Sequence, residues 1–290
     1  MQRVRFTNSR GQSVEFGSSP PYVLTKIDGL GDVEAEIQTQ KAPFQDGSSY
    51  INSFLEERHI TIQIGMYAAG IKELSKTRSE FSSIFNPKLG EGTLQYIYGD
   101  EVKEITVVSE SIPILPSGRD NRIGDFQMAM VSLKCPSPYW LSKDDQVDSL
   151  AVYEGGLTFP LSLSTTFSIQ SESKSKIITN EGHESTPLLI TFTGPATAPI
   201  RITNETTSEF IEVNQNLLQG EELVINTEFG KKKVVKVDAN GNETNAFHYI
   251  NLQSSFFQLV QGNNLLSYST GAAFERAPVV LTWRNRYVGV

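Results

Sequence analysis

The stretch Arg58-His-Ile-Thr-Ile-Gln-Ile-Gly-Met66 alternates between apolar and polar residues. Residues two apart in a strand point to the same side, so the pattern predicts a strand with one buried face. His59 falls on the opposite side, where we expect it to be solvated. The residues expected on the buried face are Ile60, Ile62, Ile64 and Met66.

The segment after this strand predicts the one substantial helix of the chain. Between residues 71 and 85 the apolar side chains recur at helical spacing, and lysines and glutamates occupy the opposite side. The helix ends before Asn86-Pro87, because proline disfavours the helical conformation in the residue that precedes it. Leu94-Gln-Tyr-Ile-Tyr98 then predicts another strand. A single amphipathic helix among many strands must cover one face of a sheet.

Further strands flank this unit on both sides. The last of them runs into Cys135-Pro-Ser-Pro-Tyr-Trp140, where strand pairing ends because proline donates no backbone hydrogen bond. We expect Tyr139 and Trp140 to close the end of the first core. The additional strands predicted in this half are residues 4–6, 13–16, 22–27, 33–38, 104–110 and 126–135.

The second half of the chain carries short apolar runs separated by turn residues, with no helical pattern. Many short strands at such spacing predict a β-sandwich. The fold class expected is therefore mainly β, with an N-terminal β-sandwich-like domain that contains one α-helix and a C-terminal β-sandwich. The runs are residues 161–163, 176–179, 188–192, 200–203, 210–213, 223–226, 233–237, 247–250, 256–260, 265–269, 279–283 and 287–290.

The length of 290 residues suits two domains. We expect the first domain over residues 1–141 and the second over residues 157–290. The polar stretch between them contains Lys143-Asp-Asp145 and Gly155-Gly156, which predicts a linker over residues 142–156.

Composition excludes several classes of protein. The net charge of −8 argues against general nucleic-acid binding, which needs clustered lysine and arginine. Cys135 is the single cysteine, so no intrachain disulfide can form. The first residues lack the apolar core of a signal peptide, and no apolar run is long enough to span a bilayer. We therefore expect synthesis in the cytoplasm and no membrane insertion.

The sequence contains no pattern typical of a catalytic, cofactor-binding or metal-binding site. His59, His183 and His248 are not spaced as metal ligands, and no nucleophile elbow or phosphate-binding loop is present. Adjacent carboxylates such as Glu221-Glu222 point to opposite faces of a strand, which does not suit the carboxylate pair of a glycosidase. Lys231-Lys-Lys233 predicts an exposed hairpin tip. We expect no enzyme activity, no cofactor and no metal.

Two polar loops of the first domain are candidates for interaction. Residues 41–50 carry Phe44 and Tyr50, two rings that need a surface on which to pack. Between their own domain and a neighbouring subunit, we favour their own domain. Residues 116–125 are polar and punctuated by glycine, which predicts a mobile loop or a long hairpin tip.

The order and spacing of these segments resemble the distal tail proteins of bacteriophages with long, non-contractile tails, over nearly the whole chain. In the first domain the resemblance rests on residues 58–66, Phe85-Asn-Pro87, Gly92-Thr-Leu-Gln-Tyr96 and Leu133-Lys-Cys-Pro-Ser-Pro-Tyr-Trp140. In the second it rests on Pro199-Ile-Arg-Ile-Thr-Asn204, Gly220-Glu-Glu-Leu-Val-Ile-Asn-Thr227, Phe256-Phe-Gln-Leu259, Gly262-Asn-Asn264 and Trp283-Arg-Asn-Arg-Tyr287.

One departure from the family lies in the second domain. The family tends to read Ile-Asp-Thr where this chain has Ile225-Asn226-Thr227. The difference leaves the architecture untouched, but it weakens any role for a carboxylate at that position.

The resemblance implies a structural hub of a phage or prophage tail. In the family, six copies form a ring through the first domain, between the end of the tail tube and the baseplate or tip. DNA passes through the ring without specific binding, and an acidic chain suits such a channel because like charges repel. The second domain is a galectin-like or carbohydrate-module-like sandwich of jelly-roll type that projects outward and can hold receptor-binding proteins.

The partners that the resemblance implies are other copies of the chain in a homo-hexameric ring, a tail-tube protein, a tail-tip or tail-associated lysin-type protein, and a receptor-binding or tail-fibre protein. The implied location is the virion tail, after assembly in the cytoplasm of the host bacterium. A closed ring also pairs sheet edges that carry an aggregation risk in a monomer. Our candidates for the ring interface are Phe44, Tyr50, Arg119 and Asp120.

The alternative hypothesis is a carbohydrate-binding adhesion module that contacts glycans of the host cell surface. Such a module needs exposed aromatic rings beside polar groups. The candidate stacking residues are Tyr249, Tyr268 and Phe274, for which a place in the core or at its rim is the more ordinary role. A hydrolase is a third class of protein. The sequence does not favour it, because it contains no recognisable nucleophile.

Overall fold

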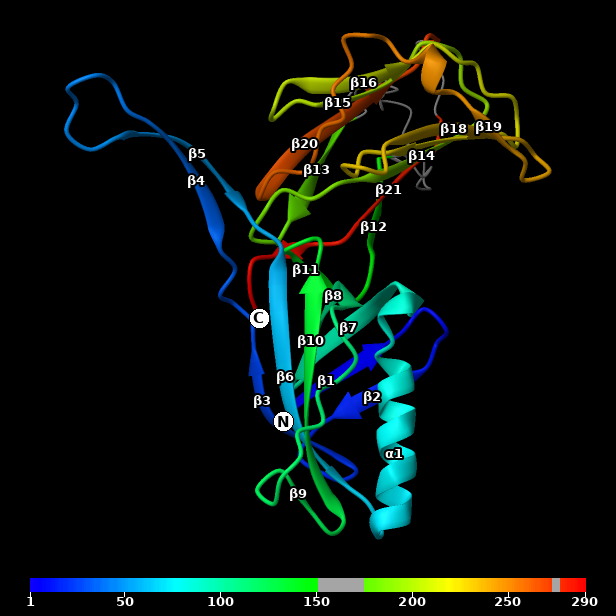
Figure 1. The fold of residues 1–290 in the computed structure, drawn as a ribbon. Helices are drawn as coiled ribbons and strands as arrows, with labels where there is room; N and C mark the ends of the chain where they lie inside the picture. Colours follow the sequence, from blue (N-terminus) through cyan, green and yellow to red (C-terminus); the bar gives the residue numbers. More distant parts are fainter. Residues whose placement is uncertain (151–174, 273–276) are drawn as a thin grey trace, which may run out of the picture. The chain divides into compact units, whose positions relative to one another are not determined.

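The structure is a computed structural model that describes residues 1–150, 175–272 and 277–290. The chain divides into two compact units. Unit 1 comprises Met1–Lys143 together with Tyr287–Val290, and unit 2 comprises Asp144–Arg286. Within the described ranges, α1 (Ile71–Ile84) is the only α-helix, and strands make up most of the regular structure (Figure 1). The predicted mainly β class and the predicted helix are both confirmed.

Unit 1 is built on one antiparallel sheet with the strand order β2-β1-β7-β8-β10-β6-β3. The two edge strands meet, because a β-bridge joins Gly17 to Val23 and the Leu24 N–H donates to the Gly17 carbonyl at 2.7 Å. The sheet therefore curls back on itself, which shortens its unpaired edges. Its main strands are β1 (Gln2–Thr7), β2 (Ser13–Phe16), β3 (Tyr22–Asp28), β6 (Arg58–Tyr67), β7 (Glu91–Tyr98), β8 (Glu101–Ser109) and β10 (Phe126–Cys135).

Shorter elements complete this part of the chain. The strands β4 (Ala35–Gln40) and β5 (Ser49–Leu55) pair only with each other. The 3-10 helix η1 (Pro87–Leu89) follows α1, and the side chain of Asn86 accepts a hydrogen bond from the Lys88 N–H at its start. The remaining short strands are β9 (Arg122–Ile123), which pairs with β10, β11 (Trp140–Ser142), which pairs with β8, and β22 (Arg286–Tyr287).

The core of unit 1 forms where α1 packs on the sheet. The predicted apolar face of β6 is fully buried from Ile60 to Met66. The ring of Phe85, at the C-terminal cap of α1, stacks on Phe6 with ring centres 4.4 Å apart, and Phe81 lies 5.4 Å from Tyr22. The side chain of Trp140 is also buried, and its indole N–H donates to the Leu30 carbonyl at 3.2 Å. The helix is thus held by aromatic packing on the sheet.

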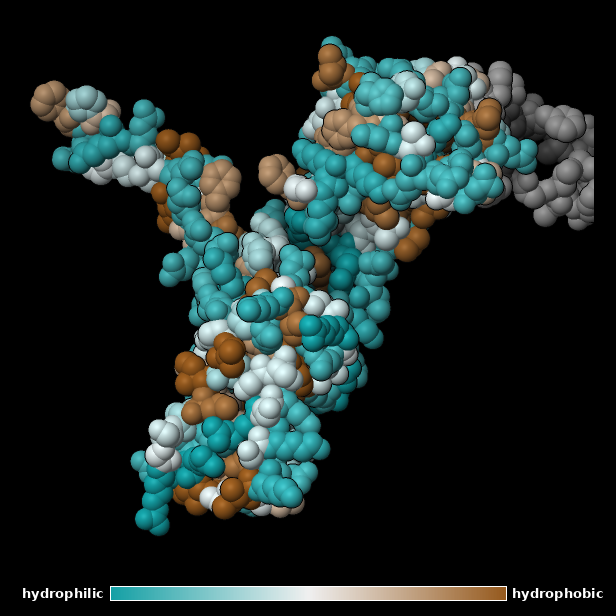
Figure 2. Space-filling model, turned by 45° about the vertical axis from the view of Figure 1, so that its right-hand side comes forward, coloured by the Kyte–Doolittle hydropathy of each residue, from teal (hydrophilic) through white to brown (hydrophobic). Residues whose placement is uncertain are grey.

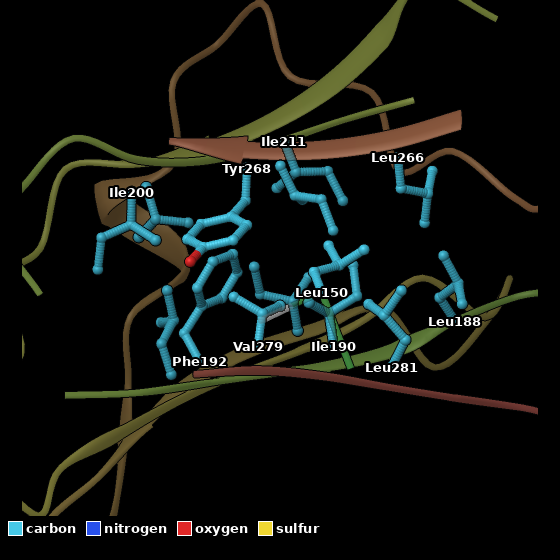
Figure 3. Packing of buried hydrophobic residues seen from close by; sticks show 14 of the residues in the cluster. Leu150, Leu188, Ile190, Phe192, Ile200, Ile211, Leu266, Tyr268, Val279 and Leu281 are labelled. Atoms are coloured by element: carbon cyan, nitrogen blue, oxygen red, sulfur yellow. The ribbon is translucent and has the colours of Figure 1, made fainter. Parts of the chain in front are cut away.

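Unit 2 contains two antiparallel sheets whose apolar side chains meet (Figure 3). Alternation along each strand gives every sheet one apolar face, so the two sheets form a sandwich. One sheet contains β12 (Gln146–Ser149), β21 (Val279–Trp283), β14 (Leu189–Thr193), β17 (Glu222–Asn226), β18 (Lys233–Val237) and β19 (Glu243–Asn245). The other contains β13 (Ser175–Asn180), β20 (Gly262–Ser269), β15 (Ile200–Asn204) and β16 (Glu209–Val213).

Buried asparagines organise the loops of unit 2. Asn180 donates from its side-chain amide to the carbonyls of Glu184 and Leu259, at 2.9 and 3.0 Å. Asn204 donates to the side-chain oxygen of Asn264 at 3.2 Å. These amides satisfy backbone groups that the sheets leave unpaired, as buried polar groups require.

Several segments differ from the sequence-based expectation. Residues 247–250, expected as a strand, form the 3-10 helix η2 (Phe247–Tyr249), because the Asn245 side chain accepts the Phe247 N–H and turns the chain. Residues 256–260 form only a single bridge, from Thr186 to Leu259. Residues 146–149, expected in a linker, form β12 in a sheet of unit 2, and Tyr287–Val290 belong to unit 1. The strand expected at 161–163 lies outside the described residues.

Candidate assembly interface

The β4–β5 hairpin projects from unit 1 as a two-stranded sheet of its own, which we call the arm (residues 35–55; Figure 1). Every residue of β4 is exposed, and so is every residue of β5 except Leu55, which is half-buried. A lone two-stranded hairpin is marginally stable in water, because it buries little apolar surface. The arm therefore has the character of a segment that packs on another molecule.

The register of the arm separates two faces. Ile37 pairs with Ser53 and Thr39 with Tyr50, so these four residues share a face, on which the Tyr50 hydroxyl lies 3.1 Å from the Ser53 hydroxyl. Ala35 and Leu55 continue this surface, which we call the apolar face. Ile37 and Tyr50 are each 64% exposed. Figure 2 shows hydrophobic side chains lying open along the arm.

The opposite face of the arm is mostly polar. It carries the pairs Glu36 with Phe54, Gln38 with Asn52, and Gln40 with Ser49. Ile51 occupies a register shift between the two faces and is 57% exposed. The arm thus has one side suited to an apolar partner surface and one side suited to water.

The tip of the arm holds Phe44 in the open. Its side chain is fully exposed, and its backbone φ of 64° lies in the left-handed region. A non-glycine residue there costs about 1–2 kcal/mol. Gln45 fixes the turn, since its side chain accepts from the Ala42 N–H at 3.0 Å and donates to the Ser49 hydroxyl at 3.3 Å. The expectation that Phe44 and Tyr50 pack on their own domain is wrong, because the hairpin carries both rings away from it.

The second candidate loop, residues 116–125, is a hydrogen-bonded hairpin tip. The Gln127 side chain donates to the Pro116 carbonyl at 2.9 Å, and the Arg122 N–H donates to the Gly118 carbonyl at 3.0 Å. Arg119 and Asp120 are exposed, and neither has an ion-pair partner in the described part of the chain. Both side chains are free to meet another molecule.

The structure does not bring the two groups of ring candidates together. The arm leads into β6 at Arg58, whereas β9 adjoins the other end of that strand, where Phe126 pairs with both Ile123 and Tyr67. Ten residues of strand separate the two ends, about 30 Å. Phe44 and Tyr50 therefore belong to one surface, and Arg119 and Asp120 to another.

The three candidate glycan-stacking residues have different environments. Tyr268 is only 6% exposed, and its ring points into the sandwich 6.3 Å from Phe192, so it cannot stack on a glycan from solvent (Figure 3). It lies on the inner face of β20, whose alternation directs it to the core. Tyr249 is 40% exposed beside His248, with ring centres 4.0 Å apart. Phe274 lies outside the described residues.

Sequence reasoning missed Ile37, Ile51 and Phe54 as interface candidates. Their apolar character was visible, and they flank the polar loop at residues 41–48 on both sides. Alternation alone predicts a buried face but does not say what buries it. Only the isolation of the arm from the main sheet shows that residues 1–150, 175–272 and 277–290 provide no layer that covers it.

Arg58 fixes the base of the arm. Its guanidinium is buried and donates to the carbonyls of Gly29, Pro138 and Val288, at 2.9, 2.9 and 2.6 Å. Burial lowers the pKa of this guanidinium, whereas the nearby Cys135 and Asp32 oppose the shift. Gly29 lies between β3 and β4, and Arg58 follows β5, so one side chain ties both strands of the arm to unit 1.

The described part of the chain holds no candidate for a metal site or a membrane-spanning helix. In the described ranges, no three side chains of the metal-binding types gather closely enough to hold an ion. Among the same residues, no helix has both the length and the hydropathy to cross a bilayer. His59, exposed as expected, pairs with Glu110 at 3.0 Å.

Models of known protein families match both halves of the chain. The family model of the phage tail protein RIFT-related domain matches residues 9–132, and that of the siphovirus-type tail component, C-terminal domain, matches residues 181–287. No curated protein matches the chain in sequence.

Two solved structures share the fold. The crystal structure of the Dit protein of phage SPP1, described as a paradigm of the hub adsorption apparatus in phages that infect Gram-positive bacteria, has a TM-score of 0.70 at 11% identity over 98% of each chain. The phage P2 baseplate, in its activated conformation with calcium, has a TM-score of 0.56 at 9% identity over 100% of each chain.

The fold and the two family models define a structural component of a bacteriophage tail. The two matched ranges cover most of the chain between them, one in each half. The chain belongs to the siphovirus-type tail component family, the distal tail proteins of siphophages. Its role is structural, in the distal tail and baseplate of the virion.

Proposed function

We propose that this protein is a ring-forming hub, with six copies that join the tail tube to the baseplate or tip and leave a channel through which DNA passes. The observation that carries the proposal is the arm, whose apolar face stays exposed in the described part of the chain. The arm of each copy contacts a different surface of the next copy. Such heterologous contacts form a closed ring when the equal rotations between successive copies add up to a full turn.

The exposed side chains of the arm are of the kind that stabilise protein interfaces. Tyr50 and Phe54 are aromatic, and Ile37 and Ile51 are β-branched, each more than half exposed. Burial of an apolar side chain of this size contributes about 1.5–3 kcal/mol. Part of that gain is offset by the loss of translational and rotational freedom on association. In a closed ring the same contact recurs at every subunit, so the favourable free energy of burial is gained at each interface.

The matched structures support the same role by analogy. One is described as a hub adsorption apparatus and the other as a baseplate. In our proposal unit 1 forms the ring and unit 2 is the outward-facing domain that holds a receptor-binding or tail-fibre protein. A tail-tube protein and a tail-tip or lysin-type protein contact the two ends of the ring, and assembly takes place in the host cytoplasm.

The test is the mass of the full chain in solution by light scattering after size exclusion, over a wide range of concentration. We expect a shift toward six subunits as the concentration rises. Ile37→Glu places a charge on the apolar face and raises the midpoint concentration of assembly by about tenfold or more. Gln38→Glu adds the same charge to the neighbouring position, which is also exposed but lies on the polar face, and should leave the midpoint unchanged.

Two results count against the proposal. Equal behaviour of the Ile37→Glu and Gln38→Glu variants would remove the apolar face from the interface. A wild-type chain that stays monomeric at every concentration, and also in the presence of purified tail tubes, would overturn the ring itself.

A further inference from the structure

Exposed aromatic rings surround a lysine on unit 2. The Lys232 ammonium lies 5.3 Å from the ring centre of Phe229 and 5.2 Å from that of Phe256. Phe256 in turn stacks on Phe247, with ring centres 5.8 Å apart and planes 12° from parallel. We call these four residues the aromatic–lysine patch.

The patch is open to solvent but anchored to the core. Phe229 is 84% exposed and Phe247 is 45% exposed. Phe256 is half-buried and packs on the core of unit 2, which holds the patch in place. Aromatic residues, phenylalanine among them, are enriched at protein interfaces, and a charge beside them favours a partner of opposite charge. Phenylalanine has no hydrogen-bonding tip, so the patch favours an apolar side chain over the hydroxyls of a sugar.

The charge of the patch is unmatched among the residues that the structure describes. Lys231 pairs with Glu228 at 3.3 Å, and Lys233 pairs with Glu243. Lys232, between them, has no carboxylate partner among the described residues. In a chain with a net charge of −8, this ammonium offers a binding site for a carboxylate from outside.

The tip of the arm offers the matching groups. Phe44 is the most exposed aromatic ring of the described residues, and Phe229 is the next. Asp46 lies two residues after Phe44, is exposed, and has no ion-pair partner in the described ranges. The tip therefore presents a ring and a carboxylate close together, and Gln45 holds it in one conformation through two hydrogen bonds. A preformed tip loses less entropy on binding than a mobile one.

We propose that the arm tip of one copy docks on the aromatic–lysine patch of a neighbouring copy, with Phe44 against Phe229 and Asp46 paired with Lys232. This inference rests on the proposed function, because it names the surface that a neighbouring copy offers to the tip of the arm. The apolar face and the tip then bind different regions of the neighbour, and the ring depends on unit 2 as well as on unit 1.

Cross-linking between copies tests the contact directly. Full-length Asp46→Cys, carrying a size tag, is mixed with full-length Lys232→Cys and treated with a mild oxidant. We expect a mixed disulfide dimer that forms about tenfold faster than in a control mixture of Asp100→Cys with Lys232→Cys. Asp100 is exposed in the turn between β7 and β8, so it matches Asp46 in type and accessibility. The native Cys135 is buried and does not compete.

A rate equal to that of the control mixture would overturn the inference. The assay traps transient contacts, so it does not require a stable hexamer.

Charge exchange is the second test, read out as the midpoint concentration of assembly. Asp46→Lys and Lys232→Asp should each raise the midpoint about tenfold, and the double variant should restore it to within about threefold of the wild type. Phe229→Ala should raise it as well, whereas Leu252→Ala, an even more exposed apolar position outside the patch, should not.

The two proposals fail in different ways. If Ile37→Glu weakens assembly while Asp46→Lys, Lys232→Asp and Phe229→Ala leave it unchanged, the tip of the arm does not bind the patch. In that case the docking inference is wrong and the ring stands. If single charge changes weaken assembly and the double variant does not recover it, the pairing of Asp46 with Lys232 is wrong.

Discussion

Arg58 and Val288 are 230 positions apart in the chain, yet the Arg58 guanidinium donates to the Val288 carbonyl at 2.6 Å. The contact lies within unit 1, which the last four residues of the chain join. The same guanidinium binds the carbonyls of Gly29 and Pro138. A single buried cation therefore fastens the start of β6, the turn before the arm and the end of the chain.

Replacing Arg58 by methionine should lower the free energy of unfolding by about 3 kcal/mol, because three backbone carbonyls, of which that of Gly29 is buried, lose a charged donor. The measurement is urea unfolding of the full chain, followed by tryptophan fluorescence. Arg5→Met is the control: Arg5 is exposed and pairs with Glu15, and such surface pairs contribute at most about 1 kcal/mol. A loss no larger than that of the control would contradict the role assigned to Arg58.

Deleting residues 287–290 tests the same contact from the other side. The deletion should destabilise unit 1, and its effect combined with Arg58→Met should be smaller than the sum of the two single effects, because both remove the hydrogen bond to Val288. Additive losses in a double-mutant cycle would mean that other contacts hold residues 287–290 in place.

Gly29 should not tolerate a side chain. Its φ is +92°, and a Cβ at this position would lie 2.0 Å from the His59 carbonyl oxygen. Gly29→Ala therefore strains the backbone and displaces the strand that carries Arg58, at a cost of about 2–4 kcal/mol. Gly31→Ala, in the same turn with no atom within 4 Å of the new Cβ, should change stability by less than about 1 kcal/mol. Thermal unfolding of the two variants compares them, and equal melting temperatures would contradict the steric argument.

Cys135 should be inert in the folded protein. Burial raises the pKa of this thiol to about 12, although the nearby Arg58 works against the shift. At about pH 8 a thiol reagent should modify the protein only after denaturant is added, because the nucleophile is the thiolate. Rapid modification of the native chain would contradict this prediction.

The same shift gives a dependence of stability on pH. The thiol of the unfolded chain ionises from a pKa near 9.0, whereas that of the folded chain stays protonated up to about 12. The contribution of Cys135 to stability is therefore fully present below pH 9 and is lost as the pH rises toward 12. The difference in unfolding free energy between wild type and Cys135→Val should be constant below pH 9 and should shift toward the variant above it.

Phe81 is expected to carry much of the packing between α1 and the sheet. Its side chain is fully buried among Phe16, Tyr22 and Phe85. Phe81→Ala should cost about 3–5 kcal/mol, through lost burial and the cavity left behind. Phe54→Ala, on the exposed arm, should leave unfolding within about 0.5 kcal/mol of wild type. Circular dichroism in increasing denaturant measures both, and a small effect at Phe81 would mean that the helix is held elsewhere.

Most regular elements could be predicted from sequence, because their signals are local. The alternation over residues 58–66 and the helical spacing from residue 71 depend on near neighbours, and β6 and α1 begin where expected. Phe247 and its neighbours show the limit of such reasoning. An apolar run resembles a strand, but one hydrogen bond to the Asn245 side chain turns it into a helix.

The sequence by itself determined a mainly β chain, because strand periodicity and turn residues are local signals, and its resemblance to distal tail proteins indicated a phage tail. Tertiary structure alone decided which apolar residues stay exposed. Tyr268 and Tyr50 both lie on strands, yet one is buried in the sandwich and the other is open on the arm. Periodicity fixes which side chains share a face, whereas burial depends on whether a second layer covers that face, and for the arm no such layer is found among the described residues.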